Sequence, residues 1–310
     1  MKVFNQKILS YLRCPRCGIV FQVKGNFLIC KGCGQKYKIV GHCLLRDPEV
    51  FVSDYEFSRE KWDNYYRGSC LKKLENEENE YLQRHLNEIY KQISEYKPIK
   101  EVVYLEIGCG LMFFGQKIAR DCQLVIGVDF SETALRIAEK LFKKKGIKNF
   151  FLIQTDIRKM PLRENSIDLS YGGGVIEHFK DTQTCIDELY RVLKPGGVSF
   201  NTVPYLNLGS LIYRQVWGNI PNIPILKQLA EFVHIRLLGA RHMRFGYEMS
   251  FLGMTLKRIH KKAGFRTVVV DKFDVSLILA LVPNYFRPFL TKLANYTRLF
   301  WPMIKIIGKK

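Results

Sequence analysis

The chain has 310 residues, of which 47% are hydrophobic and 25% are charged, as is ordinary for a globular protein. The length fits one large α/β domain with a small additional domain. No apolar run reaches the ~20 residues of a membrane-spanning helix, and the N-terminus lacks a signal-peptide pattern. We therefore expect a cytoplasmic protein.

The net charge of +20 is concentrated at the two ends of the sequence. Residues 1–50 carry nine Lys and Arg against two Asp and Glu, and residues 191–310 carry 19 against four. Such an excess attracts anions, including RNA, acidic lipids and phosphorylated substrates. The alternative is that the charge serves solubility alone.

Four of the nine cysteines form two pairs, Cys14-x2-Cys17 and Cys30-x2-Cys33. This spacing predicts a four-thiolate zinc site, which is structural because it leaves no open coordination position. Two disulfides or four unrelated thiols are the alternatives, and the lack of an export signal disfavours disulfides. The residues between the pairs alternate as a β-hairpin with its turn at 24–26.

The stretch "ILSYLRCPRCG…FLICKGCGQKYKIVGHCLLRDPE" looks like the small zinc-ribbon family that partners, or is fused to, methyltransferases. This chain departs from the usual pattern at Lys38 and at "GHC", where that family commonly has Pro and Gly-Ile-Pro. Neither departure affects a proposed zinc ligand. We expect a zinc-ribbon domain over residues 1–50 and a second domain over residues 51–310.

The second domain contains a glycine loop after an apolar run, in "VVYLEIGCGLMFFG" (102–115). Gly108 and Gly110 fit the dinucleotide pattern G-x-G-x-x-G, but its third position is Phe113. The next apolar run ends at Asp129, whose carboxylate can accept both hydroxyls of an adenosine ribose. NAD and S-adenosylmethionine share that ribose, so these residues alone do not distinguish them.

The order of four stretches along the chain decides between the two cofactors. "YLEIGCG", "GVDFSETALRIAEK", "TDIRKMPLRENSIDLSYGGGVIEHF" and "RVLKPGGVSF" occur in the order found in class I S-adenosylmethionine-dependent methyltransferases. The sequence resembles in particular the branch that includes enzymes of ubiquinone and menaquinone biosynthesis. The resemblance implies a Rossmann-like, seven-stranded, mostly parallel sheet with helices on both faces.

The resemblance also implies cofactor contacts. Glu106 helps to hold the ammonium end, Asp129 the ribose, and Asp156 and the Ile157 N–H the adenine, while the backbone of Tyr171 and Gly172 lines the methionine tail. Leu111 and Met112 replace the small residue and glycine of many members, so the loop is expected to pack differently beyond Gly110.

Three acidic or basic residues near these motifs have alternative interpretations. Glu106 could cap a helix instead of serving the cofactor. Asp168 is expected to be structural. His178, in the "EH" that members carry after the fourth strand, is either a general base or a structural histidine.

Two segments bear on the methyl acceptor. Residues 205–247 are apolar and aromatic, and lie where this family places its acceptor lid. Residues 275–301 contain a basic amphipathic helix beyond Pro288, with Phe289 and Phe300 on its apolar side. Such a helix suits an anionic membrane surface, and the alternative is packing onto the sheet.

Three functions follow as hypotheses. The first is methyl transfer to a lipidic or lipid-linked small molecule, by an enzyme peripheral to the membrane. The second is methylation of RNA or protein, with the zinc ribbon gripping the polymer. The third is a non-catalytic cofactor-binding partner, which the intact set of cofactor positions disfavours. The sequence predicts neither the acceptor nor the oligomeric state.

Overall fold

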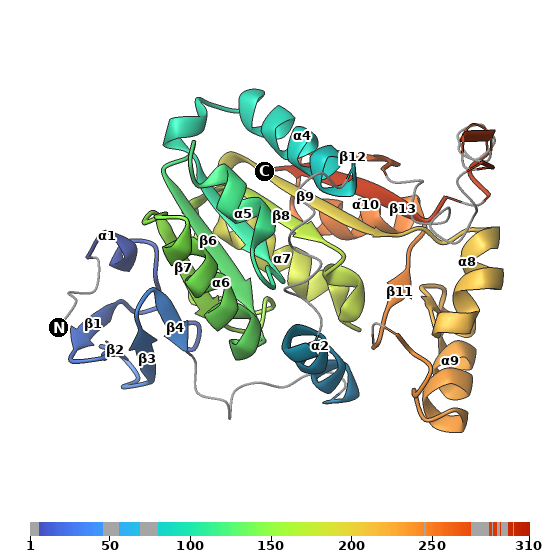
Figure 1. The fold of residues 1–310 in the computed structure, drawn as a ribbon, viewed down its shortest axis with the longest axis horizontal. Helices are drawn as coiled ribbons and strands as arrows, with labels where there is room; N and C mark the ends of the chain where they lie inside the picture. The colour runs from blue at the N-terminus through green and yellow to red at the C-terminus, as the bar shows by residue number, and fades with distance from the viewer. Residues whose placement is uncertain are drawn as a thin grey trace.

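A computed structural model describes residues 6–45, 56–68, 80–244, 246–273, 285–286, 288–289, 292, 297–299 and 301–310. Its main feature is a sheet with the strand order β1-β2-β3-β4-β7-β6-β5-β8-β9-β13-β12 (Figure 1). The seven strands from β7 to β12 form the expected Rossmann-like sheet. They are β5 (Val103–Ile107), β6 (Leu124–Asp129), β7 (Phe150–Gln154), β8 (Ile167–Gly173), β9 (Leu193–Pro204), β12 (Thr267–Lys272) and β13 (Met303–Lys309).

Within this part of the sheet, β7, β6, β5, β8 and β9 run parallel, and β13 is antiparallel to both of its neighbours. Parallel strands buried on both faces need near-continuous apolar sequence, and β5 and β6 are buried along their whole length. The prediction of a mostly parallel, seven-stranded sheet is confirmed.

Successive side chains of β5 enter two different apolar clusters, because side chains alternate across a strand. Val103, Leu105 and Ile107 pack with α7 and α10, whereas Tyr104 packs with α4, α5 and α6. The helices therefore cover both faces of the sheet (Figure 1). Their bounds are α4 (Glu80–Ser94), η2 (Ile99–Glu101), α5 (Phe113–Ile118), α6 (Glu132–Lys144), η3 (Ile176–His178), α7 (Thr182–Val192) and α10 (Gly253–Ala263).

The N-terminal domain extends this sheet. It contains α1 (Gln6–Leu9), β1 (Phe21–Lys24), β2 (Phe27–Cys30), β3 (Lys36–Val40) and β4 (Cys43–Leu45). The β1–β2 hairpin turns at the expected position. Beyond it, β4 pairs in parallel with β7, and Leu12 forms a bridge with Leu162. The domain is thus joined to the large domain by backbone hydrogen bonds, which the sequence did not indicate.

Between β9 and α10 lies the segment 205–247, which the sequence assigns to an acceptor lid. Because β11 pairs with β10 of this segment, we include it and call residues 205–250 the lid. It contains α8 (Leu208–Ile212), η4 (Tyr213–Trp217), β10 (Ile220–Pro221), α9 (Pro224–Glu231), the π-helix η5 (Phe232–Leu237) and β11 (Met249–Ser250). In Figure 1, α8 and α9 occupy the end of the molecule opposite to the N-terminal domain.

Two helices that the sequence predicts lie only partly within the described residues. The apolar residues of 74–97 recur at helical spacing, which predicts a helix. The structure shows this helix as α4, and residues 69–79 lie outside the described part. Most of the 275–301 segment, including Phe300, also lies outside it. Among the helices of the described residues, none is long and apolar enough to cross a membrane.

Candidate functional site

The glycine loop follows β5 at the carboxyl edge of the parallel strands, where open α/β sheets bind ligands. Gly108 and Gly110 have φ angles of +52° and +49°, which glycine adopts readily. A Cβ atom at Gly110 would lie 2.5 Å from the hydroxyl oxygen of Tyr66. The loop therefore requires glycine at both positions, for conformation and for close approach.

The glycine loop accommodates the large side chain of Met112 because neighbouring glycines leave space for it. It has a left-handed backbone (φ +54°) and is completely buried. A Cβ atom placed on Gly115 or on Gly127 would lie only 2.5–3.1 Å from the thioether end of Met112. These two glycines therefore leave room for the Met112 side chain. Met112 thus fills the space beside these two glycines, and a difference in packing from other members of the family stays a prediction.

Asp129 connects the glycine loop to the next loop. One of its carboxylate oxygens accepts from the Gly110 N–H at 2.7 Å, and the other accepts from the Ser131 N–H at 2.8 Å. Burial raises the pKa of Asp129 to about 6, against the lowering effect of these two backbone donors. A buried carboxylate thus lies at the position predicted to hold the ribose.

Glu106 lies beneath the same loop. It accepts from the Gly115 N–H at 2.7 Å and from the Tyr104 hydroxyl at 3.3 Å. Burial raises its pKa to about 8, and the nearby charge of Asp129 acts in the same direction. Gly115 lies in the first turn of α5, so Glu106 bonds to a helix N-terminus, as the capping interpretation expects. Its contact with a cofactor ammonium group stays a prediction.

Asp156 follows β7, the strand next to Asp129 in the sheet, and Thr155 N donates to Asp129 O at 3.0 Å. The Asp156 carboxylate forms an ion pair with Arg158 at 2.6 Å, and the Arg158 guanidinium lies 5.1 Å from the centre of the Phe179 ring. Ile157 is buried in the apolar core. The structure thus places Asp156 and Ile157 at the carboxyl edge of the sheet, and their contacts with adenine stay predictions.

Tyr171 and Gly172 end β8 at this edge. The Tyr171 side chain is buried and its hydroxyl contacts Nδ1 of His85. A Cβ atom on Gly172 would lie 2.6 Å from Oδ1 of Asn201 and 2.7 Å from Ile107. Packing therefore accounts for glycine at position 172, and the predicted backbone contacts with the cofactor stay predictions.

His178 lies in η3, after β8, and contacts the lid. Its Nδ1 atom is hydrogen-bonded to the carbonyl oxygen of Tyr247. Because a carbonyl only accepts, Nδ1 carries the proton in the neutral ring and Nε2 can accept one. The ring also packs edge-on against Trp62 at a centroid distance of 5.7 Å.

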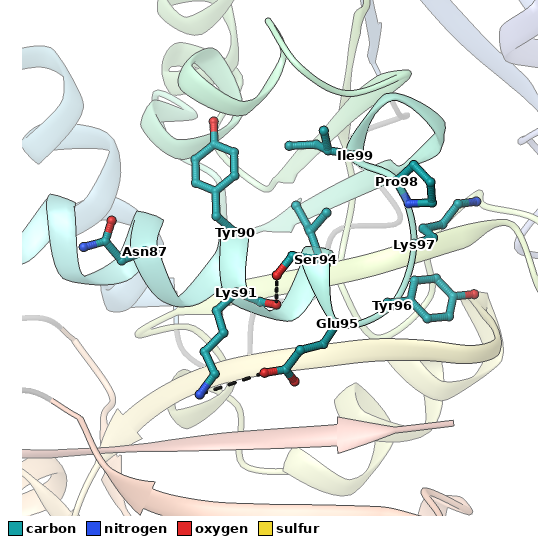
Figure 2. A pocket seen from close by; sticks show the side chains of 10 residues that line it. Asn87, Tyr90, Lys91, Ser94, Glu95, Tyr96, Lys97, Pro98 and Ile99 are labelled. Carbon is teal, nitrogen blue, oxygen red and sulfur yellow. Dashed lines mark hydrogen bonds and ion pairs between the residues drawn. The ribbon is translucent and has the colours of Figure 1, made fainter.

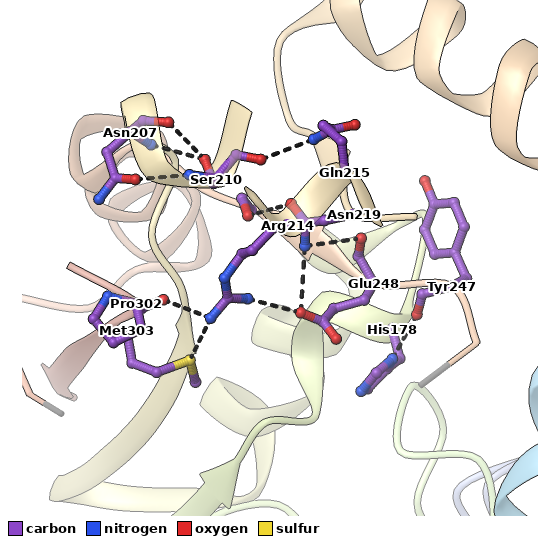
Figure 3. A network of polar contacts seen from close by, with 11 residues as sticks. His178, Asn207, Ser210, Arg214, Gln215, Asn219, Tyr247, Glu248, Pro302 and Met303 are labelled. Atoms are coloured by element: carbon purple, nitrogen blue, oxygen red, sulfur yellow. Dashed lines mark hydrogen bonds and ion pairs between the residues drawn. The ribbon is translucent and has the colours of Figure 1, made fainter. Parts of the chain in front are cut away.

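The base of the lid contains a polar network next to His178 (Figure 3). Arg214 donates to Glu248 and to the Pro302 carbonyl, both at 2.9 Å, and Asn219 donates to Glu248 at 3.3 Å. Burial, together with the charge of Glu248, raises the pKa of Glu177 well above its usual range. Arg214 thus forms an ion pair with the partly buried Glu248, and the buried Glu177 close to this pair favours its protonated form.

Asp168 is structural, as expected. Its carboxylate is completely buried and accepts from the Val103 N–H at 2.9 Å, Lys194 Nζ at 2.9 Å and Lys97 Nζ at 3.2 Å. These contacts lie at the amino ends of β5 and β8, away from the carboxyl edge.

The helix α2 (Glu56–Gly68) supplies residues that the sequence analysis missed. Asp63 accepts from the Ser131 hydroxyl at 2.7 Å, and Tyr66 lies over Gly110. Lys61 donates to the lid at the Ala240 carbonyl, at 3.1 Å. The aromatic stretch "KWDNYYRG" (61–68) is the feature of the sequence that could have indicated these residues. The helix thus contacts both the cofactor loop and the lid.

A large hollow, of about 800 Å³, lies elsewhere, along the end of α4 and η2 (Figure 2). It is open, and its lining includes an exposed ion pair between Lys91 and Glu95 at 4.0 Å. Since η2 precedes β5, this hollow lies at the amino edge of the sheet. It contains none of the predicted site residues, so we do not assign the active site to it.

The four cysteines of the N-terminal domain come together. The Sγ atoms of Cys14, Cys17, Cys30 and Cys33 all lie within 4.8 Å of one another. The closest pairs are 3.3 and 3.6 Å apart, too far for disulfides. Four sulfurs at ~2.3 Å from a central ion would be roughly 3.8 Å apart, so the cluster has the size of a tetrahedral zinc site.

Comparison with known proteins identifies the central region. Residues 105–200 match the family described as "Methyltransferase domain". The demethylmenaquinone methyltransferase of Lactococcus lactis is 30% identical over 155 residues, covering 48% of this chain and 58% of that protein. The malonyl-[acyl-carrier protein] O-methyltransferase of Hamiltonella defensa is 29% identical over 139 residues, covering 44% and 51%.

A solved structure supports the fold. The S-adenosylmethionine-dependent methyltransferase of Mesorhizobium loti superposes with a TM-score of 0.52 at 16% identity, covering 74% of this chain and all of that chain. Residues 105–200 thus form a methyltransferase domain with the class I fold. The chain spans less than two thirds of the length of the curated relatives named above.

Proposed function

We propose that this protein is an S-adenosylmethionine-dependent methyltransferase acting on a lipidic or lipid-linked small molecule. The observation that carries the proposal is the buried Asp129 carboxylate, which is hydrogen-bonded to Gly110 at the carboxyl edge of a methyltransferase domain. Each oxygen of a carboxylate can accept more than one hydrogen bond. Asp129 can therefore hold ribose hydroxyls while still accepting from the loop.

The residues at this edge fit the cofactor. Gly108 and Gly110 bring backbone close to the ligand, and Glu106, Asp156, Ile157, Tyr171 and Gly172 would supply the remaining contacts. Tyr66 of α2 lies over Gly110, so α2 is expected to shift when the cofactor binds. When bound, S-adenosylmethionine supplies an activated methyl group, so the protein mainly has to align the acceptor and exclude water.

His178 is the proposed general base. Its Nδ1 is hydrogen-bonded to the Tyr247 carbonyl, which orients Nε2 as the proton acceptor. Trp62 packs against the ring and would form one wall of the acceptor site. A base is needed only if the acceptor loses a proton during transfer, so loss of activity in His178→Ala would indicate such an acceptor.

A zinc ion held by Cys14, Cys17, Cys30 and Cys33 is proposed to stabilise the N-terminal domain. The thiols have the number and spacing of a structural site. A domain of about 50 residues buries too little apolar surface to be very stable without such a ligand.

Methylation of RNA is the second candidate function, favoured by a groove between the two domains. The groove has a volume of about 530 Å³ and lies beside the Leu12–Leu162 bridge; its charged lining residues are Arg13, Lys159, Arg163, Arg191, Glu164 and Glu188. Arg191 is paired with Glu188. The three other cations outnumber the remaining carboxylate and could contact a phosphate backbone. Strongly salt-dependent RNA binding that is lost in Lys159→Gln/Arg163→Gln would favour this candidate.

The experiment that separates these candidates uses S-adenosylmethionine labelled in its methyl group. The protein is incubated with cell extract, which is then separated into lipid, RNA, protein and small-molecule fractions. We expect label in the lipid fraction, and none with an Asp129→Ala variant. Label in RNA alone would exclude the lipid proposal, and no label in any fraction would contradict methyl transfer.

A further inference from the structure

Many of the large apolar side chains that are exposed in the described residues lie in the lid. Its α9 helix is mostly apolar, yet none of its residues is buried. Ile225 is 78% exposed, Leu229 59% and Phe232 51%. These residues are four and three positions apart, so they form one stripe along the helix. A helix of this kind normally buries such a stripe against a core.

The second lid helix continues this surface. Leu208, Leu211 and Ile212 of α8 are exposed, and Val216 of η4 is 71% exposed. The two parts are joined, because Gln215 of η4 is hydrogen-bonded to His234 of η5 at 2.9 Å. Leu299 is also exposed, and its carbonyl accepts from Gly209 of α8. In Figure 1, α8 and α9 lie at the same end of the molecule, so their exposed apolar side chains are at that end.

The acidic and the basic side chains of the lid differ in their exposure to solvent. Its two acidic residues face inward: Glu248 pairs with Arg214, and Glu231 accepts from the Tyr247 hydroxyl at 2.8 Å. Arg236 and Arg241 are exposed and Lys227 is partly exposed. The outward face of the lid therefore combines apolar and cationic side chains.

We propose that this face of the lid docks onto an anionic lipid bilayer. Exposed apolar patches of this extent mark interaction sites, and an apolar stripe flanked by Lys and Arg is typical of helices lying in the membrane interface. A second copy of the chain would be repelled by the same cationic face, and a small acceptor could not cover two helices.

The proposal places the docking surface on the lid rather than on the 275–301 helix alone. Phe289 of that segment is 67% exposed, and the residues that carry the proposal are those of α8, η4, α9 and η5. The inference rests on the proposed function in one respect: His178 contacts the lid, so docking would bring a membrane-dissolved acceptor near it.

The test measures co-sedimentation of the full chain with vesicles, without cofactor. One set of vesicles contains phosphatidylcholine with phosphatidylglycerol, and the other contains phosphatidylcholine alone. The lid variant is Ile225→Ser/Leu229→Ser/Phe232→Ser. The matched control is Met254→Ser/Val269→Ser, which changes exposed apolar residues outside the lid.

We expect the wild type to bind the anionic vesicles and to be released at high salt. The lid variant should bind at least about tenfold more weakly, because it loses apolar area that would enter the bilayer, and the control should bind as the wild type does. Thermal unfolding should be unchanged in both variants, since the altered side chains are exposed.

A folded lid variant that binds vesicles as well as the wild type would overturn the proposal. So would a wild-type dimer in size-exclusion chromatography that the lid variant dissociates, because the face would then be an interface between copies. Calorimetry with S-adenosylmethionine separates the two proposals: a protein that binds cofactor but no vesicles refutes docking alone, and the reverse result refutes the proposed function alone.

Discussion

The N-terminal domain and the lid are both additions to the same central sheet, but they are attached in different ways. The N-terminal domain joins through backbone hydrogen bonds between β4 and β7 and at the Leu12–Leu162 bridge. The lid joins through buried polar side chains around Arg214 and through apolar residues such as Ile220, Met243 and Met249, which belong to the main core. It nevertheless leaves the apolar side chains of α8 and α9 exposed. The first addition is therefore part of the scaffold, whereas the outer helices of the second are shaped to contact something outside the molecule.

Removal of the metal should cause the largest loss of stability, and it tests how the N-terminal domain is attached. Binding of structural zinc contributes on the order of 10–16 kcal/mol in isolated zinc fingers. We expect chelation to unfold β1–β3 while the large domain stays folded, because the apolar cluster on one face of its sheet contains no buried residue of the N-terminal domain. Hydrogen exchange should show loss of protection over Phe21–Val40 and continued protection of β5 and β6.

Two variants sharpen this test. Cys14→Ser should lose the metal, whereas Cys185→Ser, whose thiol lies in α7, should retain it. Purified protein that contains no zinc, and whose four clustered thiols react freely, would contradict the account.

Disruption of the polar network at the base of the lid should cause the next largest loss of stability. Arg214→Met leaves the largely buried Glu248 carboxylate without its cation, and loss of one partner of a buried ion pair typically costs about 3–5 kcal/mol. Urea denaturation measures the free energy of unfolding. Lys91→Ala is the control, since its ion pair with Glu95 is exposed and should contribute almost nothing. Equal stability of the two variants would show that the network does not hold the lid.

A smaller effect on stability should come from pH, through Glu106 on β5 of the central sheet. The pKa of Glu106 is raised to about 8 by burial, so the folded protein binds a proton there that the unfolded chain has released. Stability should therefore fall as the pH rises through this range. The pKa values of His85 and His260 are lowered by burial to about 3 and about 4, so both are neutral in the folded state at neutral pH.

Glu106→Gln isolates this contribution. Between about pH 6.5 and about pH 8.5, the wild type should lose on the order of 1–2 kcal/mol more than the variant. Parallel pH profiles of the two proteins would mean that Glu106 is ionised in the folded state throughout this range.

Much of the sheet and of its carboxyl edge could be predicted from the sequence. Buried strands such as β5 and β6 are continuous apolar runs, and the glycine loop and Asp129 follow them directly along the chain. The pairing of β4 with β7 joins residues about 110 positions apart through backbone atoms, which leave no side-chain pattern to read. The position of α2 over Gly110, and the exposure of α9, depend on tertiary packing that local periodicity does not specify.

The central claim is that Asp129 holds an S-adenosylmethionine ribose, and isothermal titration calorimetry tests it most directly. The wild type should bind one molecule per chain. Asp129→Ala should weaken binding by about 2–3 kcal/mol, because charge-assisted hydrogen bonds are lost, and Asp187→Ala on α7 should not change it. Equal affinity of the wild type and Asp129→Ala would contradict the assignment of the cofactor site.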